Sequence, residues 1–376
     1  MIFLDNSSTS HKKPKKVLRT YYKTIKKLSV NPSRGAYPLS IKASLKILQT
    51  RQNLAKFFNA DNFENIIFTS GCTESINLAL IGSKKNNGNI LTTCNEHNSV
   101  LRTLSYLKNN YNISSTHIKP NKSGEFNIQD FEKNLKSNSY LVIVNHTSNV
   151  NGHTININEI GNFCKKHNLI FIVDAAQSAG HTMIDIKKNN INLLCVAGHK
   201  GLLSPQGIGV LVLNKVNIKP IKFGGTGTES INTTQPLSPP EGFEAGTQNL
   251  PSILALNEGV KFVQKNFNKI NTKIHKLTLY LITHLNNIDE VKIYNKEPKS
   301  GVVAINLKNR SLDALYSFLN SKNICTRNGL HCAPLIHKYL NTIQSGLIRI
   351  SIGYKNSKKD INKLIKAIKI FISKND

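Results

Sequence analysis

Several kinds of residue are scarce or absent in this chain of 376 residues, and the absences narrow the classes of protein it can be. Tryptophan is absent, and none of the six cysteines is paired at a short spacing such as C-x-x-C. That distribution argues against a disulfide framework and a zinc site, so we expect reduced thiols and no metal. No apolar run reaches the ~18 residues that suggest a membrane-spanning helix. A secretory signal is not expected either, because Asp5 follows only Ile2, Phe3 and Leu4, and we therefore expect a cytoplasmic protein without membrane contact.

Acidic residues are also few, since 21 Asp and Glu face 50 Lys and Arg, for a formal charge of +29. Such an excess can indicate a protein that binds nucleic acid. Here the lysines are spread evenly among asparagines and isoleucines, as in residues 187–192, and a genome rich in A and T produces that mixture by codon bias. We therefore expect no direct nucleic-acid partner, although a non-catalytic, basic nucleic-acid-binding protein stays as a remote alternative. The charge could attract an acidic protein partner, such as a scaffold or carrier.

The apolar segments predict an α/β protein of two domains, because the chain exceeds the usual ~100 to 200 residues of one domain. Short apolar runs alternate with longer helical patterns, which is typical of a mainly parallel sheet covered by helices on both faces. The predicted strands are residues 66–69, 90–93, 140–144, 169–173, 193–197 and 208–213, the last of which could run antiparallel. Residues 223–246 are rich in Gly, Thr, Ser and Pro and predict a long functional loop or lid.

A helix that connects the two domains is predicted from about Ser252 into the 280s, after the cap Asn249 and the early Pro251. The remaining residues predict a smaller α+β domain, with strands near residues 301–307, 324–327 and 347–352 and helices near residues 312–321 and 360–372. We assign residues 15–255 to the large domain, and residues 1–14 with 256–376 to the small one.

Two apolar runs that each stop at a charged residue indicate the chemistry. The strand at residues 170–173 is followed by Asp174, and the strand at 193–197 leads to Lys200. Ligands of open α/β sheets bind beyond the carboxyl ends of the strands, so an acid and an amine should face one cavity. Pyridoxal phosphate chemistry requires an acid that keeps the pyridine nitrogen protonated and a lysine that forms a Schiff base. The pattern predicts an enzyme of this kind, although Lys200 without its strand context would be one lysine among many.

A phosphate site is predicted where the strand at residues 66–69 turns through Gly71 into a helix that begins near Cys72 and Thr73. Free backbone N–H groups at the start of a helix attract anions, and Thr73 can add a hydroxyl. The alternative is that Thr73 is an ordinary helix cap and Glu74 an ordinary first-turn acid.

Two further strand ends carry polar side chains that could reach the same cavity. His97 follows the strand at residues 89–93, and its imidazole could stack on the cofactor ring and move protons. Its alternative is a solvated loop histidine. Asn149 follows the strand at 140–144 and could donate to the phenolic oxygen of the ring, with a plain turn as the competing interpretation.

Cys332 differs from the other cysteines, four of which (Cys94, Cys164, Cys195 and Cys325) lie in or beside apolar segments and are expected to be small core residues. It stands in residues 327–334, which contain Gly, Pro and basic side chains that could lower the pKa of a thiol. From these neighbours alone, a reactive and an unreactive thiol both remain open.

Seven segments together resemble the class V aminotransferase superfamily, and more narrowly the cysteine desulfurases: residues 3–9, 31–35, 70–77, 146–152, 173–177, 198–200 and 243–247. The resemblance covers nearly the whole chain. It implies the fold type I of pyridoxal-phosphate-dependent transferases, with a mainly parallel seven-stranded type of sheet and a smaller α+β C-terminal domain.

The resemblance also implies a role for each matching residue. The cofactor residues would be Cys72 (main chain), Thr73 and His199 at the phosphate, His97 on the ring, Asp174 at its nitrogen, Asn149 and Gln177 at its phenolic oxygen, and Lys200 as the Schiff-base lysine. Thr247 would reach the phosphate of a partner subunit, which implies a homodimer. Arg349 would bind the carboxylate of the substrate, for which a guanidinium is suited, and Asn149 would also contact the substrate.

Cys332 lies in a stretch that resembles the short thiol loop of one desulfurase branch. The implied reaction converts L-cysteine to L-alanine and leaves a persulfide on Cys332, whose thiolate His331 or nearby cations could favour. The sulfur would supply iron–sulfur clusters or tRNA thiolation through an acceptor protein. The alternatives are a selenocysteine lyase and another class V lyase or epimerase. Two departures from the family pattern, Ala197 and Cys72, predict that one or two phosphate contacts are missing.

Overall fold

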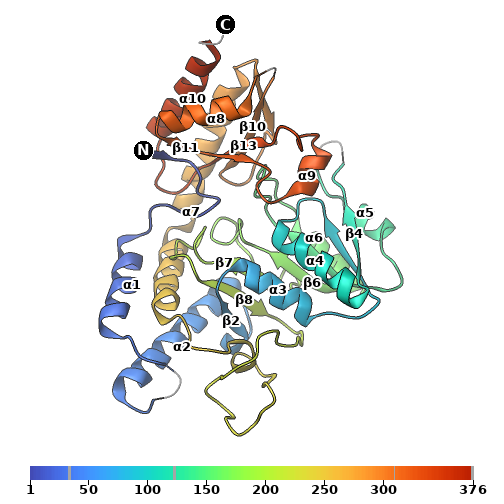
Figure 1. Ribbon diagram of the computed structural model, residues 1–376, viewed down its shortest axis with the longest axis vertical. Helices are drawn as coiled ribbons and strands as arrows, with labels where there is room; N and C mark the ends of the chain where they lie inside the picture. The colour runs from blue at the N-terminus through green and yellow to red at the C-terminus, as the bar shows by residue number, and fades with distance from the viewer. Residues whose placement is uncertain (33–34, 122–123, 309, 374–376) are drawn as a thin grey trace.

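A computed structural model describes residues 1–32, 35–121, 124–308 and 310–373. Figure 1 shows a large sheet flanked by helices and a smaller part that contains α8 and α10, with the long helix α7 passing from one to the other. Residues 33 and 34 of the motif at residues 31–35 lie outside the described residues. Within the described ranges, no helix combines the length and the apolar character needed to cross a membrane.

The large sheet has seven strands in the order β2-β8-β7-β6-β5-β3-β4. These strands are β2 (Ile66–Thr69), β3 (Asn89–Thr93), β4 (Ser114–Ile118), β5 (Ser139–Asn145), β6 (Ile170–Asp174), β7 (Leu193–Ala197) and β8 (Gly209–Leu213). β8 runs antiparallel to both of its neighbours, and the other pairs are parallel. The six predicted strands and the mainly parallel sheet are therefore confirmed. β4 was missed because its residues, Ser-Ser-Thr-His-Ile, lie at a sheet edge and form no apolar run.

Both faces of this sheet are buried, which explains the continuous apolar runs of its strands. In β5, Val142 and Val144 join the core on one face, and Leu141 and Ile143 join the core on the other. The helices around the sheet are α2 (Pro38–Phe58), α3 (Cys72–Gly82), α4 (Asn98–Tyr111), α5 (Ile128–Lys133) and α6 (Ile157–Lys166), with α1 (Lys15–Lys27) packed against α7 and a short helix η1 at Phe63–Asn65. Residues 223–246 are irregular apart from the short helix η2 (Glu241–Phe243), in agreement with the predicted loop.

Helix α7 (Leu250–Asn286) starts as predicted, with the Asn249 side chain accepting a hydrogen bond of 3.3 Å from the Ser252 N–H. Its backbone leaves helical geometry at Asn266. Its first turns pack in the core of the large sheet and its last turns pack in the core of the smaller part. Because α7 runs through residue 255 without a break, the exact boundary between the two domains stays a prediction.

The smaller part contains an antiparallel sheet in the order β12-β13-β10-β9 and a parallel pair formed by β1 and β11. Its elements are β1 (Ile2–Phe3), β9 (Val291–Tyr294), β10 (Val302–Leu307), α8 (Leu312–Ser321), β11 (Ile324–Cys325), β12 (Arg327–Gly329), α9 (Pro334–Tyr339), β13 (Leu347–Ser351) and α10 (Lys358–Ser373). β9 was missed because the exposed Lys292 interrupts its apolar residues. The single strand predicted at residues 324–327 is wrong in detail, since its two halves belong to different sheets. The first residues of the chain join this part through β1, as predicted.

Candidate active site

The predicted cofactor residues lie where the strands of the large sheet end. Asp174 is the last residue of β6, and Lys200 is the third residue after the end of β7. His97 and Asn149 follow β3 and β5. Because β3, β5, β6 and β7 are mutually parallel, these ends share one edge of the sheet, the edge at which ligands of such sheets bind.

Asp174 is a buried carboxylate, only 2% exposed, with a fixed orientation. Its Oδ1 accepts a hydrogen bond of 2.9 Å from the Ala176 N–H and one of 3.4 Å from the Cys72 thiol. Burial, followed by the charge of Asp174, raises the pKa of the Cys72 thiol, which keeps this sulfur protonated. An acid held in this way can stabilise a positive charge at the edge of the sheet.

The buried surroundings of Lys200 and His199 favour the neutral form of each side chain. Burial lowers the pKa of the Lys200 amine, and the carboxylate of Asp174 opposes that effect. A larger fraction of this amine is therefore neutral, and nucleophilic, than of an exposed lysine. Burial lowers the pKa of His199 to about 4, so this imidazole is neutral near pH 7. Its Nδ1 has no hydrogen-bond partner within the described part of the chain.

The start of α3 has the features expected of an anion site. Its cap is Gly71, and no described side chain caps the helix, so the first N–H groups are left for a ligand. The alternative in which Thr73 is the helix cap is therefore wrong. Thr73 is exposed and lies in the first turn, where its hydroxyl can join the same anion.

His97 is partly buried and caps α4, rather than being a solvated loop residue. Its Nδ1 accepts a hydrogen bond of 3.1 Å from the Ser99 N–H. In the neutral ring the proton therefore lies on Nε2. Burial is the main effect that lowers the pKa of His97, and Asp174 opposes it.

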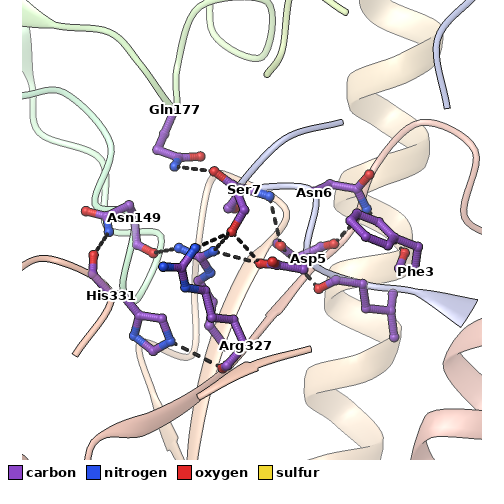
Figure 2. A network of polar contacts seen from close by, with 12 residues as sticks. Phe3, Asp5, Asn6, Ser7, Asn149, Gln177, Arg327 and His331 are labelled. Carbon is purple, nitrogen blue, oxygen red and sulfur yellow. Dashed lines mark hydrogen bonds and ion pairs between the residues drawn. The ribbon is translucent and has the colours of Figure 1, made fainter. Parts of the chain in front are cut away.

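Asn149 and Gln177 both lie in turns, and their side chains hold other segments in place (Figure 2). The Asn149 amide donates a hydrogen bond of 2.6 Å to the carbonyl of His331, and its Oδ1 is buried without a partner within the described residues. Gln177 donates a bond of 3.0 Å to the carbonyl of Ser7. The thiol loop and the N-terminal segment are thus attached directly to the predicted cofactor residues.

The thiol of Cys332 is exposed on a strained turn beside the strand ends. His331 and Cys332 have φ values of 50° and 57°, which are uncommon for residues other than glycine. The Cys332 carbonyl accepts a hydrogen bond of 2.7 Å from the N–H of Asn98, the neighbour of His97. The conformation of this loop is therefore set before any ligand binds.

His331 is a neutral ring and does not supply a positive charge beside the thiol. Burial, followed by the charge of Arg349, lowers the pKa of His331 to about 3, so the ring is neutral. Its Nε2 lies 3.3 Å from the carbonyl of Arg327, to which it donates. Of the two sources considered for a lower thiol pKa, His331 or nearby cations, the neutral His331 does not qualify, and Arg327 and Arg349 are cations near this loop.

Arg349 is buried, 3% exposed, and lies in β13 opposite Arg327 of β12. It donates hydrogen bonds to the Asn149 carbonyl at 2.9 Å and to Asp5 Oδ1 at 2.8 Å. Asp5, Ser8 and Arg327 are site residues that the sequence reasoning missed. The signal was available, because Asp5 and Ser8 belong to the opening motif at residues 3–9, to which no role had been attached.

Thr247 is the one predicted cofactor residue that a single chain does not bring to this site. It is exposed in the segment before α7, and no described hydrogen bond links it to the strand-end residues. Ala197, at the end of β7, is 2% exposed and offers no hydroxyl, so the predicted loss of a phosphate contact fits its position.

Glu96 is a buried acid that the sequence reasoning did not consider. It is fully buried next to His97, and its Oε1 accepts hydrogen bonds of 2.6 Å from Thr93 Oγ1 and 3.0 Å from the Asn145 N–H. Burial raises the pKa of Glu96 to about 8, so the group is a neutral acid near pH 7.

Replacing Glu96 by glutamine should stabilise the fold at alkaline pH. In the folded protein the Glu96 carboxyl keeps its proton up to about pH 8, whereas in the unfolded chain it loses the proton near its ordinary pKa of 4.5. Between these pH values only the folded state holds the proton. The free energy of unfolding of the native protein should therefore fall by about 1.4 kcal/mol per pH unit in this range. Glu96→Gln accepts the same two bonds and does not titrate.

Urea unfolding at pH 5 and pH 8 measures this effect. The variant should match the native chain at pH 5 and exceed its stability at pH 8, whereas exposed Glu229→Gln should show no such change. If the free energy of unfolding of Glu96→Gln differed from that of the native chain by the same amount at both pH values, a neutral Glu96 would be contradicted.

Comparisons with known proteins agree with this geometry. A profile of the family described as Aminotransferase class-V matches residues 2–364. A probable cysteine desulfurase of Pyrococcus abyssi is 33% identical over 377 residues, which is 97% of this chain and 92% of that protein. One of Borreliella burgdorferi is 31% identical over 386 residues, covering 98% and 91%.

Solved structures of other proteins are similar to this chain in their three-dimensional fold. The apo structure of a cysteine desulfurase from Thermococcus onnurineus matches with a TM-score of 0.92 at 31% identity, over 99% of this chain and 94% of that one. A cysteine desulfurase from Escherichia coli has a TM-score of 0.89 at 21% identity, covering 99% and 94%, and shows the likeness of fold alone.

The chain belongs to the class V aminotransferase family, and its fold is the type I fold of pyridoxal-phosphate-dependent enzymes. Within that family, it belongs to the cysteine desulfurases.

The cofactor of this family is pyridoxal 5′-phosphate, and the residues present fit it. The uncapped start of α3 and the unpartnered His199 Nδ1 suit a phosphate group. The oriented Asp174 suits a protonated ring nitrogen, and the partly neutral amine of Lys200 suits attachment to an aldehyde.

Proposed function

We propose that this chain converts L-cysteine to L-alanine and keeps the released sulfur as a persulfide on Cys332. The observation that carries the proposal is the attachment of the thiol loop to the cofactor residues. The Asn149 amide holds the His331 carbonyl, and the N–H next to His97 holds the Cys332 carbonyl. The only strained, exposed thiol among the described cysteines is thereby fixed beside the site that contains Lys200.

Each residue has a task that follows from its surroundings. When bound, pyridoxal phosphate withdraws electrons from the α-carbon of an amino acid. Arg349 orients the substrate carboxylate, and Lys200, whose pKa burial lowers, accepts the α-proton. The Nε2 proton of His97 is available for the return of a proton, because Nδ1 is engaged by Ser99.

The sulfur step balances without an outside oxidant. The Cys332 thiolate attacks the substrate sulfur, an S–S bond forms, and the Cβ–S bond breaks with its electron pair moving to the carbon. Protonation of that carbon completes alanine. The sum is cysteine plus a thiol giving alanine plus a persulfide.

Amino-acid analysis and sulfide detection test the activity. The holoenzyme supplied with cysteine and a thiol reductant should form alanine and sulfide in equal amounts. Alanine without sulfide, or no turnover of cysteine, would contradict the proposal. Faster release of selenide from selenocysteine, together with independence from Cys332, would support the selenocysteine lyase alternative instead.

A homodimer is part of the proposal, and exposed apolar side chains support it. Large apolar residues are exposed on α1 and α2 and in residues 223–246: Leu18, Tyr22, Ile25, Leu39, Ile41, Leu45, Phe223, Ile231 and Leu237. Residues of α2 and of the segment 223–246 line one common hollow, and the exposed Thr247 follows the same irregular segment. A second copy covering this surface would place Thr247 where it can reach the phosphate of its partner.

A negative charge introduced on this surface should separate the subunits. Leu45 is 60% exposed, and Leu45→Glu would place a carboxylate in the apolar contact between the subunits. We expect this variant to be a monomer that retains the cofactor poorly. Light scattering gives the mass, and absorbance after dialysis gives the retained cofactor. Ile343→Glu, at a side chain 40% exposed in the smaller part, is the matched control and should stay dimeric. A monomeric native protein that retains its cofactor would contradict the dimer.

The acceptor of the sulfur is proposed to be a protein with an acidic surface, because the chain carries a formal charge of +29. Supply of sulfur to iron–sulfur clusters or to tRNA thiolation is the corresponding physiological task. The cytoplasmic location stays a prediction.

A further inference from the structure

The loop between β3 and α4, residues 94–97, carries two contacts of the candidate active site. Its last residue is His97, whose Nδ1 accepts a hydrogen bond of 3.1 Å from the Ser99 N–H. The next residue, Asn98, donates from its N–H to the Cys332 carbonyl at 2.7 Å. The position of this loop therefore sets where the imidazole and the turn that carries the exposed thiol lie.

Backbone pairing between strands does not fix this loop against the neighbouring strand β5. The pairing of β3 with β5 ends at Leu91, opposite Val142, although both strands continue beyond these residues. β5 runs on to Asn145, which pairs with Asp174 of β6. Another contact must therefore set the separation between the end of β3 and the end of β5.

The carboxyl group of Glu96 supplies that contact. Its Oε1 accepts a hydrogen bond of 3.0 Å from the Asn145 N–H and one of 2.6 Å from Thr93 Oγ1. A second bond joins the same two segments, because the Asn145 amide donates to the Asn95 carbonyl at 3.2 Å. One carboxyl oxygen thus spans the ends of β3 and β5, and the length of the Glu96 side chain decides how far apart they lie.

The same oxygen sets the place of His97 relative to Asp174. His97 follows Glu96 directly in the chain, and Asp174 lies opposite Asn145 in the pairing of β5 with β6. The Asp174 carbonyl also accepts a hydrogen bond of 3.0 Å from the His146 N–H, so this end of β6 is tied to β5. A change in the length of Glu96 would therefore move the imidazole relative to the carboxylate.

Glu96 makes these contacts without adding a charge beside Asp174. The side chain is fully buried, and burial raises the pKa of Glu96 to about 8, so the group is neutral near pH 7. In both hydrogen bonds its Oε1 is the acceptor. The oxygen of a side-chain amide accepts in the same way, so glutamine at this position keeps both the length and the two bonds.

We propose that Glu96 is a positioning residue, whose carboxyl group holds the loop between β3 and α4 at a fixed distance from β5 and thereby places His97 relative to Asp174. Glu96 acts through its length and its acceptor oxygen, and it transfers no proton. The inference rests on the proposed function, in which His97 acts beside the cofactor. It deepens that function by naming the residue that sets the place of this imidazole.

Two substitutions in the holoenzyme show whether the length or the acidity of Glu96 matters. Glu96→Asp is one methylene shorter, and a displacement of that size should lower kcat by about tenfold or more. The KM for cysteine should change less than about twofold, because Arg349 is not moved. Glu96→Gln should keep kcat within about twofold of the native value. The opposite order, with activity kept in Glu96→Asp and lost in Glu96→Gln, would indicate proton transfer and overturn the proposal.

The visible circular dichroism of bound pyridoxal phosphate gives a second readout, which does not depend on turnover. The signal arises from asymmetric contacts of the ring, so it should weaken in Glu96→Asp and stay native in Glu96→Gln. A native signal in Glu96→Asp would overturn the proposal even if that variant lost activity. Failure of the proposed function is distinguishable, because the native protein would then not turn over cysteine while the dichroism of the variants kept the expected order.

Two neighbouring threonines of β3 provide a matched pair if Glu96→Asp does not fold. Thr93→Val removes the hydroxyl that donates to Glu96 Oε1, so the dichroism should weaken and kcat should fall by about fivefold. Thr92 is equally buried, but its hydroxyl has no hydrogen-bond partner within the described residues, so Thr92→Val should keep both values. Native values in Thr93→Val, or equal losses in the two variants, would overturn the proposal.

Discussion

Cys332→Ala should lose sulfide release from cysteine by about a thousandfold or more, because the other thiol of the site, Cys72, has a pKa that burial raises and stays protonated. The affinity for cysteine should change little, because Arg349 and Lys200 remain. Sulfide assays and the change in cofactor absorbance on cysteine binding measure the two effects separately.

Cys325→Ala is the matched control, because this partly buried thiol of β11 lies seven residues away in the chain and outside the strained turn. It should keep native activity. If Cys332→Ala kept its turnover, sulfur release would not pass through this thiol, and a lyase acting through the cofactor alone would become the better account.

Glu244→Ala should destabilise the fold by about 3–5 kcal/mol, because it leaves a buried guanidinium unpaired. Glu244 is 8% exposed and accepts two parallel hydrogen bonds from Arg51, which is 5% exposed. It also accepts a bond of 2.6 Å from the Phe68 N–H. The pair therefore ties α2 and β2 to the segment that presents Thr247.

Urea unfolding measures the loss of stability, and two further variants show whether it comes from the unpaired charge. Glu241→Ala, in the same segment and less buried, should cost under about 1 kcal/mol. The double replacement Arg51→Met with Glu244→Leu should recover much of the stability, because it removes both charges. A Glu244→Ala protein within 1 kcal/mol of the native one would contradict the importance of this pair.

Features that depend on short stretches of sequence could be predicted. Asp174 and Lys200 were found because a buried parallel strand is a continuous apolar run, and its last residue lies at the edge where ligands bind. The six predicted strands of the large sheet follow the same rule. β4 does not follow this rule, because an edge strand needs no apolar run. Only the structure therefore revealed β4.

Contacts between distant segments could not be predicted. Asp5 and Arg349 are 344 residues apart, and their ion pair depends on how β1 and β13 meet in the smaller part. The neutral state of His331 depends on its burial, which its neighbours in sequence do not reveal. The helix cap at Gly71 rather than Thr73 depends on the exact turn between β2 and α3.

Mapping of the transferred sulfur by mass spectrometry tests the central claim most directly. The holoenzyme is given cysteine labelled with heavy sulfur, quenched with an alkylating reagent and digested. We expect one labelled persulfide, on the peptide that contains Cys332, and none on that peptide from Cys332→Ala. Labelled sulfur on another cysteine, or alanine formed without any protein persulfide, would contradict the assignment of Cys332 as the sulfur-accepting residue.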